Sequence, residues 1–168
     1  DLKINGHALE VRVYAEDPSN NFLPDIGQLH TYRRPQGLGI RVDDGFEEGM
    51  EIPIYYDPMI SKLITYGANR TEAIERMLRA IEDYKINGVT TTLGFCKFAL
   101  QHEAFTSGKF DTHFVKKHFK PEYLEQFDEE GAAVAALIAA KLQASAKPVA
   151  VGNAVEARGE MSAWKRNR

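Results

Sequence analysis

The sequence has little cysteine, little excess charge and no long apolar run. Its one cysteine, Cys96, excludes an internal disulfide and a cysteine metal site. The net charge of −3 argues against nucleic acid as the main partner, because phosphate binding requires a basic face. The longest apolar stretch, Ala132 to Ala140, is far shorter than the ~20 residues that span a bilayer. We therefore expect a cytoplasmic protein with neither a nucleic-acid nor a membrane partner.

Several signatures of chemistry are also missing. The five histidines lack the spacing of metal ligands, so we expect no metal site. No glycine-flanked serine indicates a nucleophile, and no Met-Lys-Met segment offers a biotin attachment site. Because the sequence begins with Asp1 rather than methionine, we interpret it as a fragment cut from a longer protein.

The first half of the sequence has the pattern of short β-strands. Residues 7–14 alternate between apolar and polar side chains, which indicates a strand with one apolar face. Further extended runs are predicted at 28–34, 39–43, 50–54 and 59–66, with Gly, Pro and Asp between them. We predict an α+β fold, with a mostly antiparallel sheet or small barrel-like sheet and packed helices.

The second half changes to helical spacing. Apolar residues from Ala73 to Ile81 recur with a helical period, and Asn69 with Glu72 forms a capping-box pattern. A turn is predicted at Asn87-Gly88, and a second helix begins at Thr91 or Thr92. Asp111 is predicted to cap a short helix, and a second short helix is predicted over 122–127. An alanine-rich helix over 129–143 and a tail follow. We divide the chain into a domain at 1–119, a helical extension at 120–143 and a flexible tail at 144–168.

Two polar residues stand out as candidates for a site. Arg12 has Glu10 two residues away on the same strand face, so a plain surface ion pair is one interpretation. The other is that Arg12 offers its donor fork to an anion in a cleft. Asp57 precedes Pro58, which is typical of a turn, but it could also orient an arginine. The pattern alone does not separate these alternatives.

Two segments resemble one known family. They are GHALEVRVYAEDP at 6–18 and IYYDPMISKL at 54–63, and together they are similar to the C-terminal domain of biotin carboxylase. The similarity runs from about Asn5 to Phe119 and includes FLP at 22–24, GIRVD at 39–43, AIERM at 73–77 and FDT at 110–112. A few positions look more like acyl-CoA carboxylase subunits than pyruvate carboxylase.

The resemblance implies an ATP-dependent ligase that uses ATP and bicarbonate to carboxylate biotin on a separate carrier protein or domain. This is the first half-reaction of an acyl-CoA carboxylase, which also has a carboxyltransferase component. Arg12 matches the arginine credited with contacting bicarbonate and stabilising the biotin enolate, and Asp57 matches an aspartate at the rim of that site. Thr112 and His113 match residues near the adenine of the nucleotide, and Leu38 and Arg41 match positions of a homodimer interface. An aromatic residue often occupies the first of these two interface positions, where this chain has leucine.

The resemblance also implies that most of the enzyme lies outside this sequence. ATP and Mg would be bound mainly by an N-terminal ATP-grasp part, so we expect this fragment alone to hold no cofactor and to be inactive. Two alternatives remain: the C-terminal domain of another ATP-grasp ligase, or a dimerisation or docking module without catalysis. A glycine-rich phosphate loop and an acidic metal pair upstream of Asp1 would distinguish an ATP-grasp enzyme from such a module.

Overall fold

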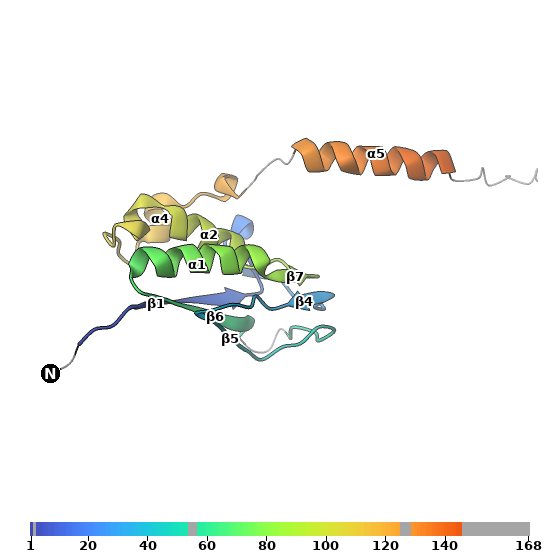
Figure 1. The fold of residues 1–168 in the computed structure, drawn as a ribbon. Helices are drawn as coiled ribbons and strands as arrows, with labels where there is room; N and C mark the ends of the chain where they lie inside the picture. Colours follow the sequence, from blue (N-terminus) through green and yellow to red (C-terminus); the bar gives the residue numbers. More distant parts are fainter. Residues whose placement is uncertain (2, 54–56, 125–128, 146–168) are drawn as a thin grey trace, which may run out of the picture. The chain divides into compact units, whose positions relative to one another are not determined.

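The computed structural model describes residue 1 and residues 3–53, 57–124 and 129–145. The chain divides into two compact units, Asp1–Gln126 and Phe127–Arg168, which we consider separately. The first unit contains the sheet and most of the helices (Figure 1). The domain limits expected at 119 and 143 stay predictions.

A three-stranded antiparallel sheet is the centre of the first unit. Its strands are β1 (His7–Tyr14), β6 (Met59–Gly67) and β5 (Ile40–Asp44), in the order β1-β6-β5. The predicted strands at 7–14 and 59–66 are confirmed, and the run at 39–43 becomes β5. Because β6 is the central strand, each of its side chains has neighbours on both sides.

Helix α1 (Arg70–Asp83) covers one face of this sheet (Figure 1). Val13 and Leu63 from the sheet and Met77 from the helix are fully buried between them. Asn69 caps the helix as predicted, since its side chain accepts a 3.0 Å hydrogen bond from the Glu72 amide. The capping box does not close on itself, because the Glu72 carboxylate accepts instead from the Ala68 amide at 2.7 Å. The opposite face of the sheet carries the polar residues of β1.

Two short ladders accompany the main sheet. β2 (Glu16–Asp17) pairs with β3 (Leu23–Pro24), and β4 (Thr31–Arg33) pairs with β7 (Lys85–Asn87). The sequence pattern missed β7, because Asn87-Gly88 is a turn signal and only pairing with distant β4 makes the preceding residues a strand. Gly88 has a φ of +105° and packs against the Gln28 carbonyl, which leaves no room for a Cβ.

The extended run predicted at 50–54 is not a strand in its described part. Residues 50–53 contribute only an isolated bridge between Gln28 and Glu51, and residue 54 lies outside the described residues. The described strands form an open three-stranded sheet and two-stranded ladders. Of the two predicted forms, the antiparallel sheet with packed helices is found, and the α+β class is confirmed.

The remaining helices of this unit are short. They are η1 (Pro18–Asn20), α2 (Leu93–Gln101), α3 (Glu103–Thr106), α4 (Phe114–His118) and η2 (Pro121–Tyr123). The prediction of Asp111 as a cap is wrong by two residues: His113 precedes α4, and Asp111 instead accepts a 2.9 Å hydrogen bond from the His113 amide. Pro121 begins a 3-10 turn that ends at Tyr123, and residues 125–127 of the predicted helix lie outside the described residues.

The second unit contains α5 (Glu129–Ser145), which confirms the alanine-rich helix. Four of its large apolar side chains are more than half exposed: Val134, Leu137, Ile138 and Leu142. Within the described part of the chain, no helix has both the length and the apolar character to cross a membrane. The cytoplasmic location stays a prediction, as does the tail at 144–168, of which only the first two residues are described.

Candidate active-site surface

Arg12 lies on the open face of the sheet, away from α1. Its side chain is 57% exposed, and its Nε lies 3.2 Å from the Glu10 carboxylate. Hydrogen bonding to Tyr14 and to Glu10 raises the pKa of Arg12, so the guanidinium is charged at every physiological pH. Arg12 therefore forms the surface ion pair with Glu10 that the sequence suggested as one interpretation. Exposure of the remaining donors keeps the side chain available to an anion.

Thr92 holds the backbone of this part of β1. Its hydroxyl accepts from the Tyr14 amide at 3.1 Å and donates to the Arg12 carbonyl at 3.3 Å, while its own amide donates to the Tyr14 carbonyl at 3.1 Å. The predicted start of the second helix at Thr91 or Thr92 is confirmed, but the Thr92 side chain does not cap that helix. Instead it replaces a neighbouring strand at the sheet edge, which orders the backbone that carries Arg12.

A small cavity of about 190 Å³ lies beside Arg12, between β1 and α2. Arg12 and Glu10 are its charged lining residues, and its remaining walls are apolar: Leu9, Val11, Phe95, Cys96, Ala99, Leu100 and Phe105. Burial raises the pKa of the Cys96 thiol to about 12, so this cysteine stays protonated and unreactive at neutral pH. Arg12 therefore borders a concave surface, shared with α2.

Asp57 lies near a second carboxylate, Glu16. Burial raises the pKa of Glu16, and the negative charge of the nearby Asp57 raises it further. The two segments are adjacent because the Ala15 amide donates to the Pro58 carbonyl at 2.9 Å. The described contacts include no bond between Asp57 and Arg12, and Tyr55 and Tyr56 lie outside the described residues. The role of Asp57 in orienting Arg12 stays a prediction.

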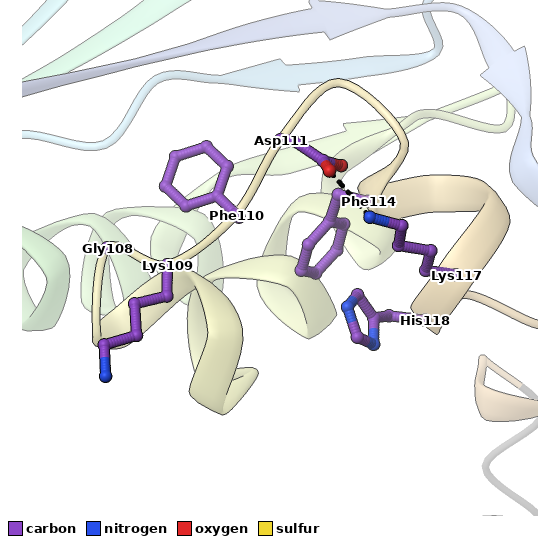
Figure 2. A pocket seen from close by; sticks show the side chains of 7 residues that line it. All are labelled: Gly108, Lys109, Phe110, Asp111, Phe114, Lys117 and His118. Atoms are coloured by element: carbon purple, nitrogen blue, oxygen red, sulfur yellow. Dashed lines mark hydrogen bonds and ion pairs between the residues drawn. The ribbon is translucent and has the colours of Figure 1, made fainter.

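The two expected nucleotide residues, Thr112 and His113, are exposed, and their sequence neighbours on both sides line a separate pocket. This pocket of about 280 Å³ is lined by residues on either side of them, including Asp111 and Phe114 (Figure 2). Lys117 donates a 2.6 Å hydrogen bond to the Asp111 carboxylate, and this bond is the main reason why the pKa of Asp111 is lowered. Figure 2 shows the Lys109 side chain extending away from this ion pair. Thr112 and His113 are thus close to a cavity, while their contact with a nucleotide stays a prediction.

Of the expected dimer residues, Leu38 lies in the turn that leads into β5 and Arg41 lies on β5 itself. Leu38 is a large apolar side chain that is 93% exposed. Arg41 is exposed on β5 and donates two hydrogen bonds to Asp43, at 2.7 and 2.9 Å. Leu38 also lines a hollow of about 240 Å³ with Arg76 and Arg79 of α1. Leu38 and Arg41 form no part of the Arg12 cavity.

No group of three or more His, Cys, Asp or Glu side chains suited to a metal ion occurs among the described residues. Sequence patterns also missed two residues near Arg12. Thr92 gave only a helix-start signal, and Lys62 lies directly opposite Arg12 in the strand register. The alternation within 59–66 groups Lys62 with Ile60, Ile64 and Tyr66, so it gives no sign of a polar face. Only strand pairing brings Lys62 opposite Arg12.

Comparisons with known proteins cover the part of the chain that contains these candidate residues. The family described as "Biotin carboxylase C-terminal domain" matches residues 10–117, a span that includes Arg12, Asp57, Thr112 and His113. The chain belongs to this family. The match covers most of the described first unit, so the fold and the family agree.

Curated relatives and a solved structure extend this finding. The chain is 49% identical over 118 residues to a pyruvate carboxylase subunit of Methanothermobacter thermautotrophicus, covering 70% of this chain and 24% of that protein. It is 50% identical over 117 residues to the mitochondrial propionyl-CoA carboxylase alpha chain of Homo sapiens, covering 68% and 16%. The chain therefore spans about a quarter of these relatives or less.

The solved structure is the biotin carboxylase domain dimer of Hydrogenobacter thermophilus 2-oxoglutarate carboxylase, in complex with MgADP, ADP and bicarbonate. It aligns with a TM-score of 0.70 at 37% identity, covering 76% of this chain and 28% of that one. Relatives with pyruvate, propionyl-CoA and 2-oxoglutarate in their names all share this domain. Membership of the family therefore does not define the final carboxyl acceptor.

Proposed function

We propose that this chain is the C-terminal part of a biotin carboxylase, which uses ATP and bicarbonate to carboxylate biotin on a carrier protein. The observation that carries the proposal is the position of Arg12, a charged guanidinium more than half exposed on the open sheet face and bordering a cavity. ATP and Mg are bound mainly by other parts of the enzyme, and this chain contributes cationic side chains.

The chemistry requires a cation where Arg12 lies. Loss of a proton from the biotin ureido group places negative charge on its oxygen, and bicarbonate is itself an oxyanion. A guanidinium held by a braced strand stabilises such charge without reorganising, and its planar fork matches two oxygens. Thr92 provides this bracing through three hydrogen bonds to β1. Asp57, near Glu16, shapes the rim of the same surface.

The test is Arg12→Ala in the full-length enzyme. We expect biotin-dependent ATP cleavage to fall about 10²–10³-fold, the usual effect of removing one donor to a developing oxyanion. Arg33→Ala is a matched control, because Arg33 is an exposed arginine on a different strand, β4, and should leave turnover unchanged. Near-normal turnover of Arg12→Ala would refute the assignment. Asp57→Asn should lower the rate without weakening ATP binding.

The proposal also includes an acyl-CoA acceptor, a homodimer and partner proteins. An acyl-CoA acceptor is favoured by the 50% identity to the propionyl-CoA carboxylase alpha chain, although the archaeal pyruvate carboxylase relative is almost as similar. A homodimer through Leu38 and Arg41 is supported by the exposure of Leu38. Leu38→Glu should then yield a monomer by sedimentation. Carrier-protein and carboxyltransferase partners follow from the same assignment, as does inactivity of residues 1–168 alone.

A non-catalytic docking module is the second candidate. The exposed apolar side chains of α5 favour it, because they offer a surface that an enzyme active site does not need. The two functions are compatible in one protein, since α5 lies in the second unit and Arg12 in the first.

A further inference from the structure

Four of the charged residues on the open sheet face form two ion pairs, and a fifth, Lys62, lies between them. On β1, Arg12 bonds Glu10 at 3.2 Å; on β5, Arg41 bonds Asp43 at 2.7 Å. Each arginine thus has a carboxylate two residues away on its own strand. Lys62 lies on β6 between these pairs, opposite Arg12 on one side and Asp43 on the other. Among the described residues of these strands, Lys62 is the charge left over.

Arg12 and Lys62 are directly opposite residues of the close type in an antiparallel sheet. The Arg12 carbonyl accepts from Thr92 at the outer edge, so it points away from β6. Arg12 and Lys62 are therefore a non-hydrogen-bonded pair, in which the Cα atoms lie about 4.5 Å apart and the side chains are closest. Side chains of directly opposite residues share a face, and like charges in this position destabilise a sheet.

Lys62 has weak compensation for this repulsion. Its side chain makes no hydrogen bond or salt bridge with any described residue. Its charge does reach Asp43, whose pKa is lowered first by the Arg41 hydrogen bond and, to a smaller degree, by the charges of Arg41 and Lys62. Since Arg41 already occupies both Asp43 oxygens, Lys62 leaves one positive charge in excess on β6, at the position opposite Arg12.

We propose that Lys62 is a second cation of the bicarbonate site, acting with Arg12. This inference rests on the proposed function and adds a residue to it. An oxyanion between the two side chains converts their repulsion into two attractions. The arginine provides a planar fork, and the lysine provides a compact charge that can approach a third oxygen. The neighbouring carboxylates, Glu10 and Asp43, are already bonded to Arg12 and Arg41.

The experiment compares Lys62→Met and Lys62→Arg in the full-length enzyme. Methionine keeps most of the apolar stem and removes the charge, while arginine keeps the charge. We expect the KM for bicarbonate in biotin-dependent ATP cleavage to rise roughly tenfold in Lys62→Met, in line with a lost charged hydrogen bond. The KM for ATP should not change, and Lys62→Arg should stay within about threefold of the parent.

A second measurement separates binding from structure. Without bicarbonate, Lys62→Met should unfold at the same or a slightly higher temperature than the parent, because repulsion from Arg12 is removed. Saturating bicarbonate should then raise the melting temperature of the parent more than that of Lys62→Met. Lys97→Met is the matched control: Lys97 is on α2 in an ion pair with Glu82, and its loss should leave the KM for bicarbonate unchanged.

The outcomes distinguish this inference from the proposed function. A bicarbonate KM within twofold of the parent in Lys62→Met, with Arg12→Ala inactive, overturns the role of Lys62 alone. If Arg12→Ala is also fully active, the proposed function of the surface fails with it. An unfolded Lys62→Met protein, with Lys62→Arg normal in both KM and melting, would show a structural role and also overturn the inference.

Discussion

The two faces of the β1-β6-β5 sheet differ in burial and in charge. On the face under α1, Val13, Leu63 and Thr65 are fully buried. On the other face, the same three strands carry Arg12, Lys62 and Asp43, which lie in one row by register. Because side chains alternate along a strand, a core residue such as Leu63 adjoins a residue of the open face such as Lys62. The sheet therefore separates stability from chemistry within a single layer.

The largest expected effect is on the buried face, and adjacent residues provide the test. Leu63→Ala should cost about 3 kcal/mol in the free energy of unfolding, because Leu63 is 0% exposed and its loss leaves a cavity. Ile64→Ala, on the open face of the same strand, should cost less than about 1.5 kcal/mol because less apolar area is lost. Urea denaturation of the chain measures both. Equal costs would contradict the difference between the faces.

A smaller effect is expected in the hydrogen-bonded tyrosine pair under the sheet. The Tyr84 hydroxyl lies 2.6 Å from that of Tyr32 and 2.8 Å from the Ser61 hydroxyl. Tyr84→Phe removes the partner of the Ser61 hydroxyl and one of two partners of the Tyr32 hydroxyl, which still donates to Asp44 at 3.0 Å. This loss in a buried place should cost about 1–2 kcal/mol by urea denaturation. Tyr123→Phe is the control, since Tyr123 is 51% exposed. A change smaller than that of the control would show that the pair is dispensable.

The edge of the sheet should respond more weakly still. Thr92→Val removes the hydroxyl that serves Arg12 and Tyr14, at a cost of about 1 kcal/mol. The sharper readout is hydrogen exchange of the Tyr14 amide, which should become faster in the variant. Thr90→Val, at an exposed threonine nearby, should leave that exchange unchanged. Unaltered Tyr14 protection in Thr92→Val would remove Thr92 from the bracing of Arg12.

The smallest effect is expected on the open face itself. Glu10→Gln should leave the urea midpoint at physiological salt unchanged, because exposed ion pairs are screened and contribute little. A clear loss of stability would mean that the Glu10–Arg12 pair is a structural element of β1. The functional interpretation of Arg12 would then lose its main support.

Sequence patterns predicted the parts of this fold that depend on neighbours along the chain. The alternation at 7–14 and the period from Ala73 to Ile81 gave β1 and α1, because burial of one face repeats with the geometry of each element. They missed β7 and α3, which are short and depend on packing against distant segments. Asp111 has the residue type of a cap, but its side chain bonds Lys117 and the His113 amide, and the residue that immediately precedes the helix is His113.

The sequence by itself determined the α+β class, the family and Arg12 as a candidate, because local periodicity and motif spacing are properties of contiguous residues. Only the tertiary structure decided that Lys62 lies opposite Arg12, that Thr92 braces their strand and that Asp57 neighbours Glu16. These relations join residues dozens of positions apart. The Arg12–Lys62 relation is set by strand register, and the other two are set by the packing of loops and helices against β1. Register and packing depend on the whole core, which no short segment contains.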